Sequence, residues 1–187
     1  MSAAPDEPAD ERLIQDALTG DDEAFAALVR RHKSKVFGIA ARYARNEHDL
    51  DDLCQEVFIR VYRKLDKFRG DAPFEHWLSR IAVRSCYDFL RKTRREKQNI
   101  SLDSMNMTLA DIAADKPVST HEVREILDFA LSHLSAKDRL VITLLELEEK
   151  SVREVAELTG WSEANVKVRA YRARKALEKV LRIYHEP

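Results

Sequence analysis

Apolar residues recur every three or four positions over most of this sequence, which is the spacing of a helix with one buried face. The first such run covers residues 23–40. A second run begins near residue 47 and has its apolar stripe at Leu50, Leu53, Cys54, Val57, Val61 and Leu65. The segment "DKFRGDAP" follows, and its glycine and proline interrupt the periodicity. A third run covers about 74–95. We expect residues 23–97 to form a small helical bundle.

The carboxy-terminal part continues the helical pattern in shorter units. In "SVREVAELTGWSEANVKVRAYRARKAL", Ser151 and Ser162 are capping residues, and Gly160 suits the positive φ of a tight turn. Two helices joined by such a turn form a helix-turn-helix, whose second helix enters the major groove of DNA. The core face of that helix comprises Val166, Ala170, Ala173, Leu177 and Leu181. We assign residues 122–187 to this domain.

The periodicity fails in two places. Residues 1–22 are acidic and are expected to form a flexible tail. Residues 98–121, which begin "QNISLDSMNMTLADIAADKPVS", are rich in Ser, Asn and Asp and are expected to form a flexible linker with one short turn near 109–113. The predicted fold class is therefore all-α: two small helical domains joined by a flexible linker.

Composition agrees with this organisation. Four glycines and five prolines leave little turn material for a many-stranded β fold. No apolar run approaches the roughly 20 residues of a membrane span, and "MSAAPDEPADER" lacks the cationic and apolar blocks of a signal peptide. Cys54 and Cys86 have no framework or metal-site spacing, which fits a reducing compartment. We expect a cytoplasmic protein without membrane insertion.

The net charge of −1 conceals a strong segregation of charge. Residues 1–24 contain eight carboxylates and one arginine, whereas residues 80–97 contain seven Lys or Arg against two acids. Residues 163–182 have the same seven-to-two balance. Because local fields decide which partner a surface attracts, two basic helices indicate two contacts with one polyanion.

The second basic helix has the chemistry for reading duplex DNA. Side chains opposite its core face can reach base edges, and those on its flanks can reach phosphates. The first group is Lys167, Val168, Tyr171, Arg172 and Lys175, and the second is Arg169 and Arg174. The alternative is a solvated charged face on a helical hairpin. The capped two-helix unit with its turn glycine favours DNA.

The first basic helix interleaves cations with aromatic rings, which suits single-stranded nucleic acid. Arg80, Arg84, Tyr87 and Arg91 project together, with Phe68, Phe74, Trp77 and Phe89 in and around the helix. We assign Phe74 and Phe89 to the core, whereas Trp77 and Tyr87 fit core and surface equally well.

The outward face of the preceding helix carries Asp52, Gln55, Glu56, Ile59, Tyr62 and Arg63. Its two apolar members indicate a protein partner or an ordinary solvent face.

Two long stretches resemble one known family. "DLDDLCQEVFIRVYRKLDKFRGDAPFEHWLSRIAVRSCYDFLRKTRR" is similar to the sigma-2 domain of bacterial RNA polymerase sigma factors. "LSAKDRLVITLLELEEKSVREVAELTGWSEANVKVRAYRARKAL" is similar to the sigma-4 domain. The two domains in this order resemble the extracytoplasmic-function (ECF) group of the sigma-70 family. The resemblance implies a sigma factor that binds core RNA polymerase and directs promoter-specific initiation, without enzymatic activity or a cofactor.

The resemblance also implies a partner for each surface. The outward face of the second helix docks on the clamp helices of the polymerase β′ subunit, and the β flap is a further contact. The loop from Phe68 to Phe74 and the helix after it open the minus-ten element, which assigns Phe68, Arg69, Phe74, Trp77, Arg80, Arg84, Tyr87 and Arg91. The recognition helix reads the duplex minus-thirty-five element through Lys167, Arg169, Tyr171, Arg172, Arg174 and Lys175. An anti-sigma factor, often tethered to the membrane, holds such proteins inactive until a stress or envelope signal arrives.

Some features depart from the family or suggest other functions. Arg84 and Val168 replace small polar residues of some relatives, which leaves the base preference open. An enzyme is disfavoured, because the six histidines are dispersed and no Gly-rich phosphate loop or nucleophile motif is present. His48 and Cys54 lie more than one helical turn apart and predict no metal site. The main alternative is a one-component helix-turn-helix regulator that binds duplex DNA without core polymerase. The second basic and aromatic surface in 23–97 argues against it.

Overall fold

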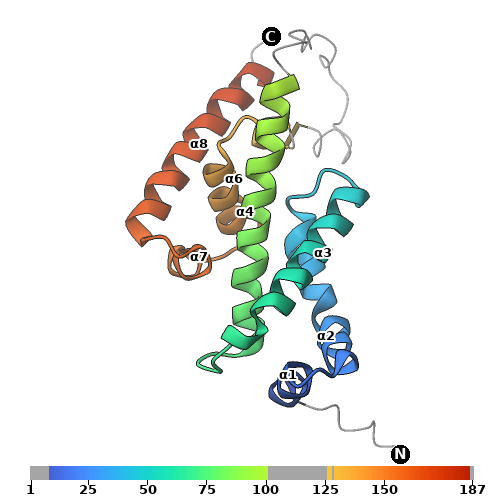
Figure 1. Ribbon diagram of the computed structural model, residues 1–187. Coiled ribbons are helices and arrows are strands. Elements are labelled where there is room, and N and C mark those ends of the chain that lie inside the picture. Colours follow the sequence, from blue (N-terminus) through green and yellow to red (C-terminus); the bar gives the residue numbers. More distant parts are fainter. Residues whose placement is uncertain (1–8, 101–125, 128, 186–187) are drawn as a thin grey trace, which may run out of the picture. The chain divides into compact units, whose positions relative to one another are not determined.

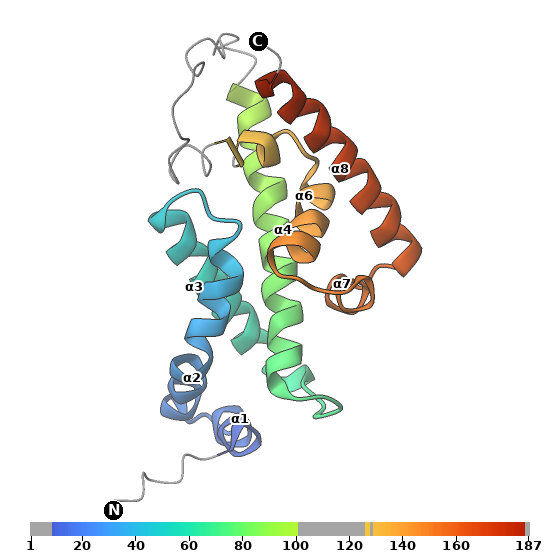
Figure 2. The same cartoon turned by 180° about the vertical axis from the view of Figure 1, so that it is seen from behind.

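The computed structural model describes residues 9–100, 126–127 and 129–185, and it contains helices and no strand within these ranges (Figures 1 and 2). The prediction of an all-α fold is confirmed. The chain divides into two compact units, Met1–Cys86 and Tyr87–Pro187, and the division falls within the long helix α4 (Phe74–Ile100). Apart from residues 98–100, which belong to α4, the expected linker and its turn near 109–113 lie outside the described residues.

The first unit consists of α1 (Asp10–Leu18), α2 (Asp22–Ala41), α3 (Glu47–Lys64), the 3-10 turn η1 (Leu65–Lys67) and the start of α4. Local capping explains where two of these helices begin. The Asp21 side chain accepts hydrogen bonds from the backbone N–H groups of Glu23 and Ala24, and Asn46 accepts one from Asp49. These bonds satisfy N–H groups that have no partner within the helix.

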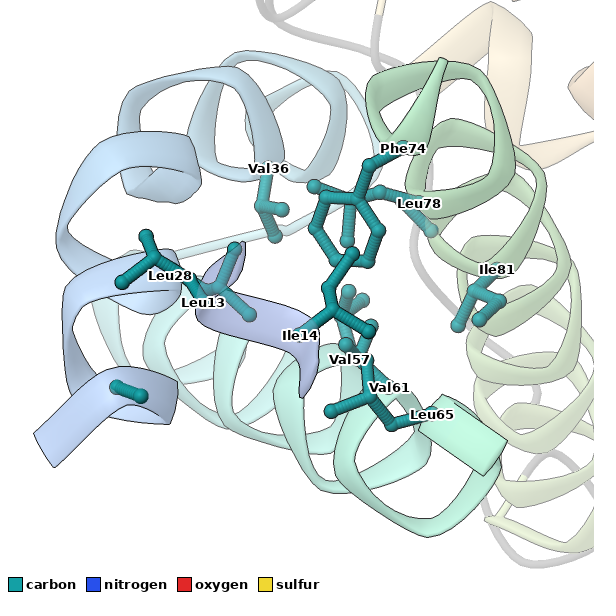
Figure 3. Close-up of a cluster of buried hydrophobic side chains, with 12 residues drawn as sticks. Leu13, Ile14, Leu28, Val36, Val57, Val61, Leu65, Phe74, Leu78 and Ile81 are labelled. Carbon is teal, nitrogen blue, oxygen red and sulfur yellow. The ribbon is translucent and has the colours of Figure 1, made fainter. Parts of the chain in front are cut away.

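The core of the first unit is one apolar cluster to which α1, α2, α3 and α4 all contribute (Figure 3). Val57 and Val61 bury the predicted stripe of α3, and Phe74 and Leu78 bury the start of α4. The assignment of Phe74 to the core is thereby confirmed, whereas Phe89 is only partly buried. Figure 3 shows Phe74 in the middle of the side chains labelled in this cluster.

The flexible tail expected over residues 1–22 is wrong for residues 10–18, which form helix α1, and for residue 22, which begins α2. The apolar residues Leu13 and Ile14 of α1 are buried in the cluster shared with the other helices. The acidic composition concealed this short amphipathic pattern. Asp10 and Glu11 in the first turn are favourable there, since carboxylates stabilise the amino-terminal end of a helix. Residues 1–8 lie outside the described part.

The second unit contains the helix-turn-helix that the sequence predicts. After α4, residues 126–127 and 129–132 are helical, and they are followed by α6 (Ala136–Ile142), the π-helical turn η2 (Thr143–Leu147), α7 (Val152–Thr159) and α8 (Glu163–His185). Ser151 and Glu154 form a capping box at the start of α7, Gly160 ends it with φ 75°, and the Ser162 hydroxyl accepts a hydrogen bond from the N–H of Asn165. The predicted caps and turn are confirmed.

The core face of α8 follows the prediction except at its end. Val166, Ala170 and Ala173 are buried, and Leu177 is partly buried. Leu181 was expected on the same face but is exposed. The buried cluster on this face includes Ala173, with Ala176 and Leu177 packed against it, and Leu181 is not among its members.

Two glycines in different backbone conformations allow a matched test of the turn. Gly160 has φ 75° and no atom within 4 Å of an added Cβ, so Gly160→Ala should lower the free energy of unfolding by about 1 kcal/mol through backbone strain alone. Gly38 is inside α2, also with open space around an added Cβ. Gly38→Ala should therefore raise stability by about 0.5–1 kcal/mol. Urea unfolding followed by circular dichroism measures both, and changes of the same sign would contradict the explanation.

Candidate nucleic-acid and polymerase interfaces

The predicted minus-ten surface starts with a loop held at both ends by aromatic rings. The ring centroids of Phe68 and Phe74 are 5.5 Å apart, and each lies within 5.7 Å of the Trp77 centroid. Phe68 and Trp77 are partly buried, whereas the intervening residues 69–73 are all exposed. Gly70 has φ 74° at the bend of this loop. The structure thus presents a short exposed loop, including Arg69, on a fixed aromatic base.

Along α4, the predicted cations keep the spacing of one helix face. Arg80, Arg84 and Arg91 are exposed, and Tyr87 is partly buried. The Arg91 guanidinium carbon lies 5.8 Å from the Tyr87 ring centroid. Among the described residues, neither Arg80 nor Arg84 forms an ion pair with a carboxylate. Both guanidinium groups are therefore available to a polyanion.

Two side chains of α2 contact the first turn of α4. Lys35 forms an ion pair with Glu75, and this hydrogen bond lowers the pKa of the Glu75 carboxyl. The His32 ring packs edge-on against Phe74 with 5.2 Å between centroids. The helical periodicity predicted neither residue, because it concerns only the apolar positions of this helix. The available signal was the spacing of His32, four residues from Leu28 and four from Val36 on the apolar stripe.

The outward face of α3 is exposed as the helical spacing predicts. Ile59 is 44% exposed and Tyr62 is 54% exposed, although the Tyr62 ring also packs against Phe25 with 4.9 Å between centroids. Gln55 and Arg63 are exposed beside them. The two acids on this face have local partners: Asp52 lies 3.6 Å from His48, and Glu56 accepts a hydrogen bond from Arg60 at 2.6 Å. The face is an apolar centre with a polar rim.

The exposed side of α8 has an apolar and aromatic centre between cations. Val168 and Tyr171 are exposed large hydrophobic residues. The Lys175 ammonium lies 5.1 Å from the Tyr171 ring centroid, within the range of a cation–π interaction. Lys167 and Arg172 are exposed on the same side, and Lys167 is 4.0 Å from Glu163. The structure therefore brings together the residues predicted to face base edges.

The two arginines predicted for the flanks of α8 have different surroundings. Arg169 donates to Asp138 at 3.1 Å and to Asn165 at 2.7 Å, and its guanidinium carbon lies 5.3 Å from the Trp161 ring centroid. Arg174 donates to Glu146 at 2.6 Å. The Arg169–Asp138 side chains are 19% and 18% exposed, whereas those of Arg174–Glu146 are 59% and 50% exposed. Arg169 thus connects α8 to the start of α6.

We also searched the described part of the chain for metal sites, reactive side chains and membrane-spanning helices. No group of three or more His, Cys, Asp or Glu there is placed to hold a metal ion. His48 is exposed, and burial raises the pKa of the Cys54 thiol above its ordinary value. None of the helices in the described ranges is long and apolar enough to cross a bilayer.

These features define a class: a two-part helical DNA-binding protein with a helix-turn-helix in its second part. Comparison with known sequences identifies the family within this class. The family Sigma-70 region 2 matches residues 28–96, and Sigma-70, region 4 matches residues 124–177. The ECF RNA polymerase sigma-E factor of Haemophilus influenzae is 32% identical over 183 residues, which cover 90% of this chain and 93% of that protein. The Escherichia coli K12 sigma-E factor is 33% identical over 177 residues, with 90% and 92% covered.

The chain therefore belongs to the ECF family of RNA polymerase sigma factors, with sigma-70 regions 2 and 4. It is a non-enzymatic transcription initiation factor. Family membership decides against a one-component regulator. Solved structures agree: CnrH in complex with the cytosolic domain of CnrY has a TM-score of 0.58 and 28% identity, covering 94% of this chain and 99% of that chain. Bartonella quintana RpoE, solved with the anti-sigma factor NepR, shares the fold (TM-score 0.56, 24% identity, 85% and 97% covered).

The contrast between the two arginine pairs of α8 gives a stability prediction. Arg169→Ala should lower the free energy of unfolding by about 1.5–3 kcal/mol, because it leaves the half-buried Asp138 carboxylate without its charged donor. Arg174→Ala should lower it by less than about 1 kcal/mol, since its pair is exposed. Urea denaturation of both variants measures the difference. Equal effects would show that Arg169 does not fix α8 to α6.

Proposed function

We propose that this ECF sigma factor docks on core RNA polymerase through the outward face of α3. It opens the minus-ten element with loop 69–73 and α4, and it reads the minus-thirty-five element with α8. The observation that carries the proposal is the surface of α4, where Arg80 and Arg84 are exposed and, among the described residues, unpaired, next to an exposed loop that is flanked by aromatic rings. A helix with that surface has the means to hold single-stranded DNA.

The α3 face supports a protein partner through its composition. Ile59 and Tyr62 expose large apolar surface that the core of the unit does not use. Apolar side chains within a polar rim are typical of the centre of a protein interface, where their desolvation supplies binding energy. The family resemblance assigns this face to the β′ clamp helices and a second contact to the β flap.

In the minus-ten surface, aromatic rings contact bases and arginines contact phosphates. Phe68 and Trp77 are partly buried, so each side chain keeps some exposed surface that a displaced base can contact. Arg80 and Arg84 can neutralise phosphates of the displaced strand. Phe74 is buried and supports the other two rings without contacting DNA. Tyr87 and Arg91 extend the surface along α4.

The α8 surface supports duplex reading by a different combination. Lys167, Tyr171 and Arg172 can reach base edges and phosphates from the exposed side of the helix. Lys175 lies against the Tyr171 ring, which restricts the orientation of that ring before DNA binds. Arg169 and Arg174 contact phosphates only when their carboxylate partners release them or share them.

An anti-sigma factor is the second partner that we propose. CnrH and Bartonella quintana RpoE were solved in complexes, the first with the cytosolic domain of CnrY and the second with the anti-sigma factor NepR. An inhibitor that covers the α3 face and the α8 surface of this chain would block polymerase and promoter together. Association with the membrane would then depend on that inhibitor.

Docking through α3 is tested by charge substitution at its apolar centre. Ile59→Asp combined with Tyr62→Asp should reduce association with core polymerase by more than about 100-fold, because loss of a hot spot at the centre of an interface costs about 2 kcal/mol or more and the new charges add a desolvation penalty. Phe37→Asp is the matched control, since Phe37 is also an exposed large hydrophobic residue but lies on α2. Fluorescence anisotropy with purified core enzyme measures the affinities. If the control loses affinity equally, the α3 face is not the specific docking surface.

Strand opening is tested by removing one cation at a time from α4. Arg80→Ala and Arg84→Ala should each preserve closed complexes while reducing open complexes, because the lost contact forms only with the displaced strand. Each lost contact to a single-strand phosphate should flatten the salt dependence of opening by about 0.7 in the logarithmic slope. Arg30→Ala removes an exposed arginine of α2 and should change neither step. Permanganate footprinting across a salt series measures opening, and an equal loss of closed complexes would refute the assignment.

A further inference from the structure

The first residue of α1 forms a polar cluster with two neighbouring residues of α2. Asp10 Oδ1 accepts a hydrogen bond from Arg31 Nη1 at 2.7 Å, and its Oδ2 lies 2.9 Å from His32 Nε2. Because an ionised carboxylate only accepts hydrogen bonds, Nε2 of His32 carries the proton in this contact. The hydrogen bond fixes both the position and the rotation of the imidazole ring.

The other side of this imidazole touches the aromatic base of the minus-ten loop. The His32 ring is buried and packs edge-on against Phe74, with an angle of 62° between the ring planes. Phe74 is 3% exposed and packs in turn against Phe68 and Trp77. A continuous series of contacts therefore runs from Asp10 on α1, through His32 on α2, to the residues that flank loop 69–73.

Stability alone is a weak explanation for a polar cluster at this position. Removing a charged pair from water costs free energy, and well-packed apolar residues often stabilise a core as much or more. The cluster does supply orientation, because hydrogen bonds are directional and a packed apolar ring can slide. The Lys35–Glu75 pair is a second contact from α2 to the same turn of α4, on the exposed side.

We propose that Asp10 and His32 are positioning residues for strand opening: the Asp10 carboxylate holds the His32 ring, and that ring holds Phe74 and the end of the minus-ten loop. This inference rests on the proposed function of loop 69–73. Asp10 precedes the region 2 match, which starts at residue 28, so α1 becomes a functional part of the minus-ten surface.

The experiment uses holoenzyme assembled from the full chain and core polymerase. The probe is a fluorescent single-stranded oligonucleotide that carries the non-template minus-ten element of a promoter transcribed by this holoenzyme. Asp10→Asn removes the charge at constant size, and His32→Phe keeps a ring but removes the N–H group. Glu23→Gln is the matched control, because Glu23 is an acid near the start of α2 whose pair with Arg30 is exposed. Arg80→Ala reports on the proposed function itself.

We expect Asp10→Asn and His32→Phe each to weaken oligonucleotide binding roughly three- to tenfold, and the double variant to be no weaker than the worse single variant, as for residues that act through one contact. Affinity for core polymerase and for duplex minus-thirty-five DNA should be unchanged, and Glu23→Gln should change none of the three affinities. A purely structural cluster would instead lower the thermal midpoint and leave the affinities at low temperature unchanged. That result would overturn the inference.

Two further outcomes separate this inference from the proposed function. If Arg80→Ala weakens oligonucleotide binding and the Asp10 and His32 variants do not, only the positioning role is wrong. If Arg80→Ala also has no effect, the proposed role of α4 is wrong and the positioning role with it. Each variant is measured at least about 15 °C below its own thermal midpoint. Should His32→Phe not fold, unchanged binding by Asp10→Asn is sufficient to reject the inference.

Discussion

Burial of Phe74 is the constraint on which the first unit depends. This ring is the first residue of α4, the end of the exposed loop and a member of the apolar cluster shared by α1, α2, α3 and α4. A ring that is 3% exposed in a close-packed core has few positions available. The end of the loop before Phe74 is therefore fixed in position. The direction of Arg80 and Arg84, which follow Phe74 on the same helix, is fixed with it. The packing of this ring in the core thus also places the surface that we propose for DNA.

The sequence was sufficient for elements whose evidence is local. Helical periodicity located α2, α3 and α4, and the cap residues Ser151 and Ser162 with Gly160 located the helix-turn-helix. It failed where the evidence is tertiary. Helix α1 is short and acidic, and only its contacts with the other helices show that Leu13 and Ile14 are core residues. The partners Asp10 and His32 are 22 residues apart, and Arg169 and Asp138 are 31 apart, so no spacing rule could have paired them.

The two basic surfaces that we propose for DNA hold their arginines in different ways. On α4, Arg80 and Arg84 have no carboxylate partner among the described residues, so contact with a phosphate displaces only counterions and water. On α8, Arg169 and Arg174 already hold Asp138 and Glu146. A phosphate must compete with those carboxylates, which reduces the net gain but keeps the arginines in defined rotamers. The α4 surface is thus suited to a strand whose shape varies, and the α8 surface to a duplex whose phosphates have fixed positions.

The contribution of α1 to the core also changes where the folding unit begins. Similarity to region 2 starts at residue 28, yet Leu13 and Ile14 share one apolar cluster with Val57, Val61 and Phe74. A fragment that starts at residue 28 would lack α1, so the cluster formed by Val57, Val61 and Phe74 would be exposed to water on the side that α1 covers. The cooperative unit detected by amide hydrogen exchange should therefore extend to Asp10, with protection in α1 lost together with protection in α2 and α3. For this chain, the region 2 match therefore begins inside the unit that we expect to fold cooperatively.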